Sequence, residues 1–267
     1  MPNPQQSQSH KAELFRSLHV PGKPLVLSNV WDSISARTVA SAEGVRALAT
    51  ASHAISEMHG VRDGENLDLE TVILWARIIS TSVDLPVSID FEKGYAPTAG
   101  GVARNVRRLI EETQAAGLNI EDTIDADATL YSLTEASDRI SAARRGVEES
   151  EVPAVIAARV DALVVEPENW DGAIERANAY LLAGADLVFV RRLATEAQVA
   201  RALNEIDGPL SVICNPSSVP LSRLAELGVA RVSFGPAMMG LAQSALSSAA
   251  ATVTALGEYP PALSFPV

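Results

Sequence analysis

Short apolar runs alternate with helical patterns along most of the chain. Eight runs of about six residues are rich in valine, isoleucine and leucine, a composition typical of strands. They cover residues 24–29, 45–50, 85–90, 117–122, 154–160, 185–191, 209–215 and 230–235. Segments between them, such as 68–83, 101–117, 170–184 and 222–228, carry apolar residues at helical spacing, and glycine closes several of these. The pattern predicts eight strand–helix units.

The predicted strands are apolar on both faces, as expected for parallel strands covered by helices. Eight such units favour a closed (β/α)8 barrel of the TIM type over the alternative, an open doubly wound sheet. No Ser/Gly linker or block of charge divides the 267 residues. The sequence therefore predicts a single barrel domain over residues 1–267, with a short polar N-terminal segment and a C-terminal tail.

The composition narrows the kind of partner. The net charge is −12 and no stripe of Lys or Arg offsets it, so extended contacts with nucleic acid or an anionic membrane would be unfavourable. A small-molecule partner is expected instead. Cys214 is the only cysteine, which excludes an internal disulfide and a thiolate-rich zinc site. Its position in the apolar run "SVICN" predicts a buried thiol.

The ends of the chain carry no targeting pattern. The N-terminal segment "MPNPQQSQSH" is polar and lacks the apolar region of a secretory signal. No run of about 18 apolar residues, the length that a membrane span needs, occurs anywhere. Together with the single cysteine, these features predict a cytoplasmic protein.

Polar side chains gather where the predicted strands end. In a (β/α)8 barrel the reactive groups lie at the carboxyl ends of the strands, so "VSIDFEKGY", residues 87–95, places Asp90 and Glu92 at the mouth. The other strand ends contribute Asn29 and Asp32, Ser52 and His53, Asn119, Glu121 and Asp122, and Arg159 and Asp161. We expect these side chains to converge on one cavity.

Four acids are expected at that mouth: Asp90, Glu92, Glu121 and, from the loop "GVRDGE", Asp63. Carboxylates that lie close together are costly unless they are protonated or bridged by a cation. Oxygen ligands without a Cys or His cluster suit Mg²⁺, or Mn²⁺, rather than zinc. The alternative is that some of the acids at the strand ends cap helices or pair with basic side chains. For Asp32 and Asp122, a structural role of this kind and a role in the site are equally open.

The same segments carry a family resemblance. The motifs "NVWDSISARTVASAEGVRALATAS", "VRDGE", "LPVSIDFEKGY", "GLNIED", "ARVDA" and "ERANAYLLAGADLVFV" resemble the isocitrate lyase/phosphoenolpyruvate mutase superfamily in order and spacing, over roughly residues 22–257. The resemblance implies a modified (β/α)8 barrel, a Mg²⁺ site and chemistry on small 2-oxo or 2-hydroxy acids through a pyruvate-like enolate. It also implies a homo-oligomer, commonly a tetramer, in which neighbouring subunits exchange the last barrel helix.

The resemblance also implies roles for individual residues. Asp90, Glu92 and Glu121 match positions around the metal ion. Ser52, with the backbone N–H groups of His53 and Ala54, matches a cradle for the substrate carboxylate. The remaining matches are Trp31, Arg159 and Arg191 beside the substrate and Asp63 near the reacting centre, with Asp63, Arg159 and Glu121 expected to be catalytic.

The chain departs from both named branches of the superfamily. Lyases carry a Lys-x-Cys-Gly-His type loop after the fourth strand, whereas residues 122–146 here contain no Lys, Cys or His. Mutases have a lysine and an asparagine in the same loop, where this chain offers Thr134 and Glu135. Arg191 replaces a lyase glutamate at the end of the sixth strand, and a second cation beside Arg159 would suit a dicarboxylate such as oxaloacetate.

The sequence therefore predicts a Mg²⁺-dependent enzyme that cleaves a carbon–carbon bond next to the carbonyl of a small 2-oxo acid. Two alternatives stay open: a mutase or hydrolase of an enolpyruvate phosphonate or phosphate, and a barrel that binds oxo acids without catalysis. Residues 236–256 are apolar and rich in small side chains over much of their surface, so we expect this segment to pack across a subunit boundary.

Overall fold

The computed structural model describes residues 4–125 and 129–264, and eight parallel strands close into a barrel. The strands are β1 (Leu25–Val30), β2 (Leu48–Thr50), β3 (Val87–Asp90), β4 (Gly117–Glu121), β7 (Val155–Val160), β8 (Leu187–Val190), β9 (Leu210–Ile213) and β10 (Arg231–Ser233). Around the barrel they follow chain order, and β10 pairs with β1 to close it. The predicted (β/α)8 barrel and all eight predicted strands are confirmed.

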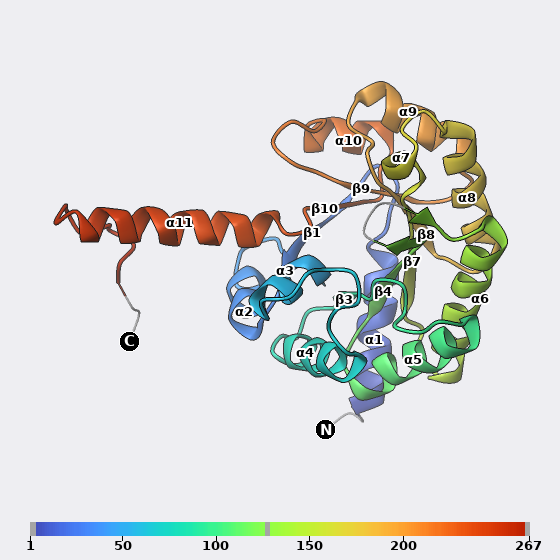
Figure 1. Cartoon of the computed structure of the whole chain (residues 1–267), viewed down its shortest axis with the longest axis horizontal. Coiled ribbons are helices and arrows are strands. Elements are labelled where there is room, and N and C mark those ends of the chain that lie inside the picture. Colours follow the sequence, from blue (N-terminus) through green and yellow to red (C-terminus); the bar gives the residue numbers. More distant parts are fainter. Residues whose placement is uncertain (1–3, 126–128, 265–267) are drawn as a thin grey trace.

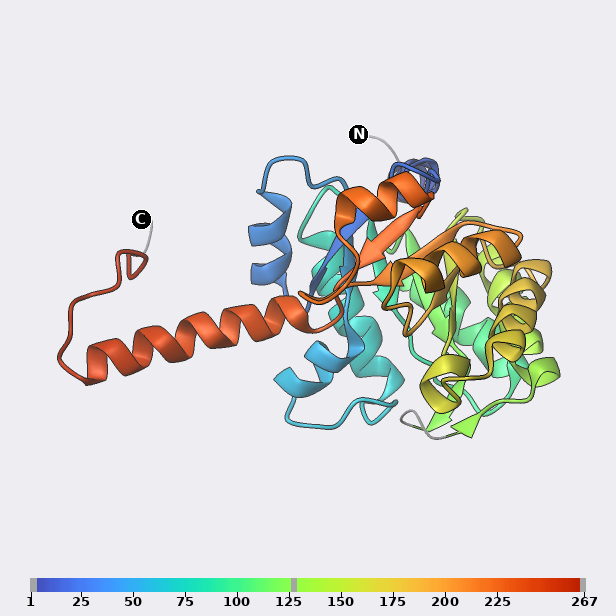
Figure 2. The ribbon, with the colours of Figure 1, turned by 90° about the horizontal axis from the view of Figure 1, so that it is seen from above.

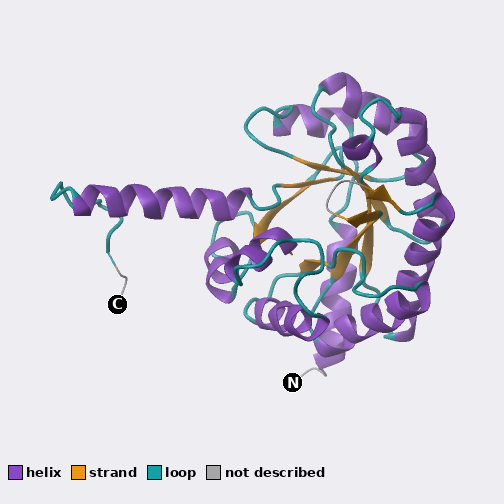
Figure 3. Cartoon of the chain, in the orientation of Figure 1, coloured by secondary structure: helices purple, strands orange, loops and turns teal. Residues whose placement is uncertain are grey.

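Helices surround the barrel, as Figures 1 and 3 show. In chain order they are α2 (Ser33–Ala40), α3 (Ser52–Met58), α4 (Leu69–Thr81), α5 (Ala99–Glu112), α6 (Leu133–Glu149), α7 (Ala162–Val165), α8 (Trp170–Leu182), α9 (Glu196–Glu205) and α10 (Leu221–Leu227). A small antiparallel hairpin, β5 (Thr123–Asp125) and β6 (Thr129–Leu130), follows β4. Residues 126–128 of the loop compared with the lyase and mutase motifs lie outside the described residues.

Side-chain caps fix where several helices begin. Asp68 caps α4 by accepting the backbone N–H of Thr71, and Thr98 and Ser132 do the same for α5 and α6. A cap satisfies one of the backbone donors that the first helical turn leaves unpaired. The three caps therefore define the first residues of α4, α5 and α6.

The N-terminal residues form a helix, α1 (Pro4–Ser17), which the strand–helix pattern did not predict. Phe15 is fully buried and packs against Gly117 at the start of β4, where a Cβ atom would lie 2.8 Å from the Phe15 ring. Gln8 donates from Nε2 to the carbonyl oxygens of Ile110 and Ala115. The helix therefore covers the amino-terminal end of the barrel, opposite the mouth.

Strand register sets charged residues side by side at the mouth. Glu121 on β4 is the register partner of Arg159 on β7, and Asp90 on β3 is the partner of Asn119 on β4. Residues two apart point to the same face of a strand, so the last inward-facing position of each strand faces the mouth. Below them the barrel interior holds the buried Arg231 of β10, whose Nη2 donates to Asn119 Oδ1 at 2.8 Å.

The last helix, α11 (Ala237–Thr254), projects away from the barrel in both views of Figures 1 and 2. Met239 is its one buried residue, while Leu241 and Leu246 are 66% and 73% exposed. Val26, on β1, is the one exposed residue of the eight barrel strands. No helix within the described ranges is long and apolar enough to cross a membrane.

Candidate active site

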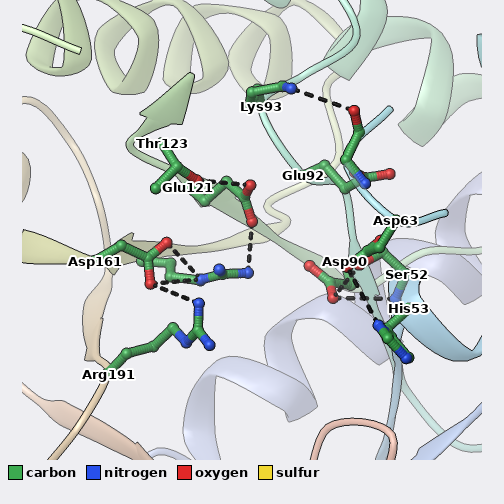
Figure 4. A network of polar contacts seen from close by, with 12 residues as sticks. Ser52, His53, Asp63, Asp90, Glu92, Lys93, Glu121, Thr123, Asp161 and Arg191 are labelled. Carbon is green, nitrogen blue, oxygen red and sulfur yellow. Dashed lines mark hydrogen bonds and ion pairs between the residues drawn. The ribbon is translucent and has the colours of Figure 1, made fainter. Parts of the chain in front are cut away.

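A cavity of about 230 Å³ opens at the carboxyl ends of the barrel strands. Its polar lining comes from Asn29, Ser52, His53, Asn119, Thr123 and Ser233. Its charged lining comes from Asp63, Asp90, Lys93, Glu121, Asp125, Arg159 and Arg191. The structure therefore brings most of the predicted site residues to one place, as Figure 4 shows from close by.

One side of the cavity is built around Asp90, the last residue of β3. Ser52 begins α3 and donates to Asp90 Oδ2 twice, from its backbone N–H at 3.1 Å and from its hydroxyl at 3.0 Å. Asp63 lies nearby in the loop before α4, and its Oδ1 atom is buried without a hydrogen-bond partner among the described residues. Burial first, and then the charge of Asp90, raise the pKa of Asp63.

The other side is an ion-pair network centred on Asp161, which is fully buried. Arg159 pairs with Asp161 at 2.8 Å and with Glu121 at 2.5 Å, while Arg191 pairs with Asp161 at 3.2 Å. Burial alone would lower the pKa of Arg159, but the charges of Glu121 and Asp161 outweigh it and raise that pKa. Burial raises the pKa of Glu121 to about 8, although Arg159 opposes this shift.

Glu92 does not face the cavity. Simple strand alternation would point it the same way as Asp90, but β3 ends at Asp90 and Glu92 has a left-handed φ of 43°. Its carboxylate accepts the backbone N–H groups of Gly64, at 2.9 Å, and Glu65, at 2.5 Å, and the hydroxyl of Tyr95. Burial raises the pKa of Glu92 to about 7.

The expected set of three metal ligands is therefore not assembled. Within residues 4–125 and 129–264, no three His, Cys, Asp or Glu side chains form a group that could hold a metal ion. Asp90 and Glu121 both line the cavity, from neighbouring strands β3 and β4, whereas Glu92 lies outside the cavity lining. Coordination by Asp90, Glu92 or Glu121 stays a prediction.

The residues expected beside the substrate fall into two groups. Ser52, His53, Arg159 and Arg191 line the cavity, and the exposed His53 ring lies 3.9 Å from Asp63. Trp31 and Ala54 lie outside the set of described residues that line it. Trp31 packs against a small cluster formed by Ala51, Ala54 and Met239 at the root of α11.

Asp32, Asp122 and Cys214 have structural roles. Asp32 caps α2 by accepting the N–H of Ser35 at 2.6 Å. Asp122 is buried and accepts the backbone N–H of Asp161 and the hydroxyl of Tyr180. The capping and pairing alternative is confirmed for both acids, and the predicted burial of the Cys214 thiol is confirmed as well, with burial raising its pKa.

Lys93 is a cavity residue to which the sequence assigned no role. Its side chain is nearly buried, and Nζ donates to the carbonyl oxygens of Ile124, at 3.1 Å, and Gly64, at 3.4 Å. Ile124 lies in β5 and Gly64 lies in the loop between α3 and α4, so Lys93 links these two segments. Its place three residues after Asp90, at the same strand end, was the available signal.

The fold and the cavity together define the class: a (β/α)8 barrel whose site is built from the loops that follow its strands. Within that class, a family model described as phosphoenolpyruvate phosphomutase matches residues 15–254. The chain belongs to this family, in the isocitrate lyase/phosphoenolpyruvate mutase superfamily of lyases and mutases.

Proteins with different names are similar in sequence to this chain. An uncharacterized protein of Mycobacterium tuberculosis is 32% identical over 222 residues, which are 83% of this chain and 81% of that protein. Oxaloacetate decarboxylase of Rhodopseudomonas palustris is 33% identical over 180 residues, 64% of this chain and 59% of that protein. The crystal structure of a "putative phosphonomutase" from Burkholderia cenocepacia matches with a TM-score of 0.85 and 36% identity, covering 90% of this chain and 98% of that one.

The raised pKa of Glu121 predicts how the stability of the metal-free protein depends on pH. Between its ordinary value of 4.5 and about 8, Glu121 binds a proton more readily in the folded state than in the unfolded state. The free energy of unfolding should therefore fall as pH rises, by up to about 1.4 kcal/mol per pH unit for such a group. Thermal unfolding in a chelator between pH 6.5 and 8 should show the slope, and Glu121→Gln should reduce it.

The window begins at pH 6.5 because His19 acts in the opposite direction below it. Burial lowers the pKa of His19 from 6.5 to about 4, so this group adds stability as pH rises between those values. Glu43→Gln, at an exposed position, is the control and should keep the wild-type slope. An unchanged slope in Glu121→Gln would show that Glu121 is already ionised in the folded protein.

Proposed function

We propose that the protein is a Mg²⁺-dependent enzyme that cleaves a carbon–carbon bond at the carbon next to the carbonyl of a small 2-oxo dicarboxylate, an oxaloacetate-like substrate. The observation that carries this proposal is the two-sided cavity, with Asp63 and Asp90 on one side and, on the other, Arg159 and Arg191, which both pair with Asp161. Cations can hold the carboxylates of a substrate, while the acids can hold a metal ion and move a proton. The oxaloacetate decarboxylase relative supports the same reaction class.

The donor set of the cavity fits a hard divalent ion. Asp90 and Glu121 offer carboxylate oxygens from neighbouring strands, and the buried Oδ1 atom of Asp63 has no hydrogen-bond partner among the described residues. Mg²⁺ keeps several waters and takes only one or two protein carboxylates, so it needs no three-acid cluster. We assign the ion, or Mn²⁺ in its place, to Asp90 and Glu121. When bound, it would stabilise negative charge that develops on the carbonyl oxygen.

The chain's own residues bind and orient the substrate. Arg159 and Arg191 would hold the distal carboxylate, because both guanidinium groups are fixed by Asp161 and both face the cavity. Ser52 would bind the other carboxylate through its hydroxyl and its backbone N–H. Loss of CO₂ leaves the bonding electron pair on the enolate, whose carbon must then take a proton. The carboxyl group of Asp63, which lines the cavity, is the donor we assign, since burial and Asp90 raise its pKa.

A mutase or hydrolase acting on an enolpyruvate phosphonate or phosphate is the second candidate. The description of the matching family model and the Burkholderia structure favour it. Two adjacent arginines would also suit a phosphonate group. We rank it second because the loop after β4 offers Thr134 and Glu135 at the positions of the mutase lysine and asparagine.

The first test of function is a substrate assay with Asp90→Ala as its control. Wild-type protein with Mg²⁺ should convert oxaloacetate to pyruvate faster than Mg²⁺ alone. Asp90→Ala should abolish this turnover and weaken Mg²⁺ binding measured by calorimetry, because it removes a carboxylate ligand. The far-UV circular dichroism of the variant should match the wild type, which separates loss of function from loss of fold.

Two outcomes of that assay would count against the proposal. Turnover of phosphonopyruvate without turnover of oxaloacetate would replace it with the mutase reading. Binding of oxalate or pyruvate without any turnover would support a binding protein, and Mg²⁺ binding that survives Asp90→Ala unchanged would remove Asp90 from the metal site.

Arg191 tests the dicarboxylate preference. A charged hydrogen bond contributes about 1.5–3 kcal/mol, so Arg191→Ala should lower kcat/KM for a dicarboxylate about tenfold to a hundredfold and spare binding of pyruvate. Arg192→Ala, one residue along and outside the cavity lining, is the matched control and should cost little. Equal losses for dicarboxylates and monocarboxylates would mean that Arg191 only supports Asp161, its partner at 3.2 Å.

We also propose that the active form is a homo-oligomer in which α11 packs on a second copy. Leu241 and Leu246 are exposed on α11, and Val26 is exposed on the outer face of β1, where a barrel helix would ordinarily cover it. Light scattering should show an oligomer at micromolar concentration, and Leu246→Asp should shift it toward the monomer. Leu182→Asp is the control, since Leu182 is 91% exposed on α8. A stable, active wild-type monomer would contradict this assembly.

A further inference from the structure

Beside the cavity, each of two glutamate side chains accepts hydrogen bonds from the backbone of the segment that carries the other. Glu92, just after β3, accepts the backbone N–H groups of Gly64 and Glu65 on Oε2. Glu65 returns the contact, because its Oε1 atom accepts the backbone N–H groups of Lys93, at 3.1 Å, and Tyr95, at 2.7 Å. The loop that carries Asp63 is thereby joined to the segment that follows Asp90 by four side-chain to backbone hydrogen bonds.

The backbone at these positions is unusual. Glu65, Glu92 and Tyr95 have φ values of 63°, 43° and 54°, in the left-handed region that non-glycine residues rarely adopt. Such conformations persist only where surrounding contacts determine them, and they concentrate at functional sites. Here each of the three residues takes part in the reciprocal contact, either as a carboxylate acceptor or as a backbone donor.

The segment after β3 is the fixed half of the arrangement. Asn105 Nδ2 donates to the carbonyl oxygens of Gly94 and Tyr95 at 3.0 and 2.8 Å. Arg139, which is buried, donates from Nη2 to the carbonyl oxygens of Lys93 and Ala96. Helices α5 and α6 therefore anchor residues 93–96 to the barrel wall, and these residues provide a fixed base for the loop that carries Asp63.

The oxygens of Glu92 are already used. Oε2 accepts two backbone N–H groups and Oε1 accepts the hydroxyl of Tyr95. The side chain lies outside the cavity lining, whereas Asp63, one residue before Gly64, lies within it. A carboxylate that has donors on both oxygens and points away from the cavity is suited to positioning a loop rather than to binding a cation in the cavity.

We propose that Glu92 and Glu65 form a reciprocal clasp that positions Asp63 over the cavity, and that Glu92 acts through this clasp rather than as a metal ligand. The inference rests on the proposed function for the role of Asp63, but the clasp itself is independent of any reaction. Glu92 and Glu65 are positioning residues. The function of the clasp is to hold the Asp63 side chain in the cavity lining beside Asp90.

Glu92→Gln is the test, since it keeps the size of the side chain and removes its charge. Amide hydrogen exchange measured by mass spectrometry over residues 60–67 should become about tenfold faster or more, because a charged acceptor of two N–H groups is lost. The kcat for the oxo acid should fall while KM changes little. The Mg²⁺ dissociation constant should stay within about twofold of wild type, in contrast to Asp90→Ala.

Glu65→Gln and the double variant show whether the clasp is reciprocal. Glu65→Gln should accelerate exchange over the same residues, and the double variant should add little to either single change, because the two sides depend on each other. Tyr95→Phe, which removes only one donor to Glu92, offers a milder change if Glu92→Gln fails to fold. Glu43→Gln, at an exposed position, should leave exchange, kcat and Mg²⁺ binding unchanged.

The outcomes separate the clasp from the proposed function. Unchanged exchange over residues 60–67 in Glu92→Gln and Glu65→Gln would overturn the clasp. A tenfold or greater loss of Mg²⁺ affinity in Glu92→Gln would also overturn it, by making Glu92 a metal ligand. If the wild-type protein turns over no oxo acid but exchange responds as expected, the clasp stands and the proposed function fails.

Discussion

Burial of charge is the constraint on which the mouth of this barrel depends. Asp161 is fully buried, and an ionised carboxylate without a partner in such a place would be strongly destabilising. Arg159 and Arg191 supply the partners, and Arg159 in turn pairs with Glu121. Because these residues come from the ends of β4, β7 and β8, strand register and ion pairing specify the same arrangement.

On one side of the mouth the buried acid is paired with arginines. On the other side, Asp90 and Asp63 have no such pairing with an arginine among the described residues. Asp90 has two donors from Ser52, but Asp63 has a buried oxygen without a partner among the described residues. Paired charges give a rigid surface that can hold an anionic substrate in one orientation. Burial and the charge of Asp90 raise the pKa of Asp63, which suits its carboxyl group to proton exchange.

The fold and the place of the site could be predicted because both follow from repeated local patterns. Parallel strands end at one rim, so Asp90, Glu121 and Arg159 had to meet there once eight strands were recognised. Helix α1 escaped prediction because its buried side chains, such as Ala12 and Phe15, are few among polar neighbours. The direction of Glu92 could not be predicted, since it depends on a left-handed backbone that interrupts strand alternation. The partners of Asp122 could not be predicted either, because Tyr180 and Arg176 lie on α8, far from Asp122 along the sequence.

The two donors of Ser52 serve one oxygen, Asp90 Oδ2, and they cannot serve a second carboxylate at the same time. A ligand that takes these donors releases that oxygen of Asp90 from its hydrogen bonds. An anion bound at the start of α3 and a cation bound by Asp90 are then linked equilibria, in which each favours the other to the same extent. The extent to which an anion and a cation strengthen each other's binding in this cavity therefore depends on a single serine side chain and its own backbone N–H.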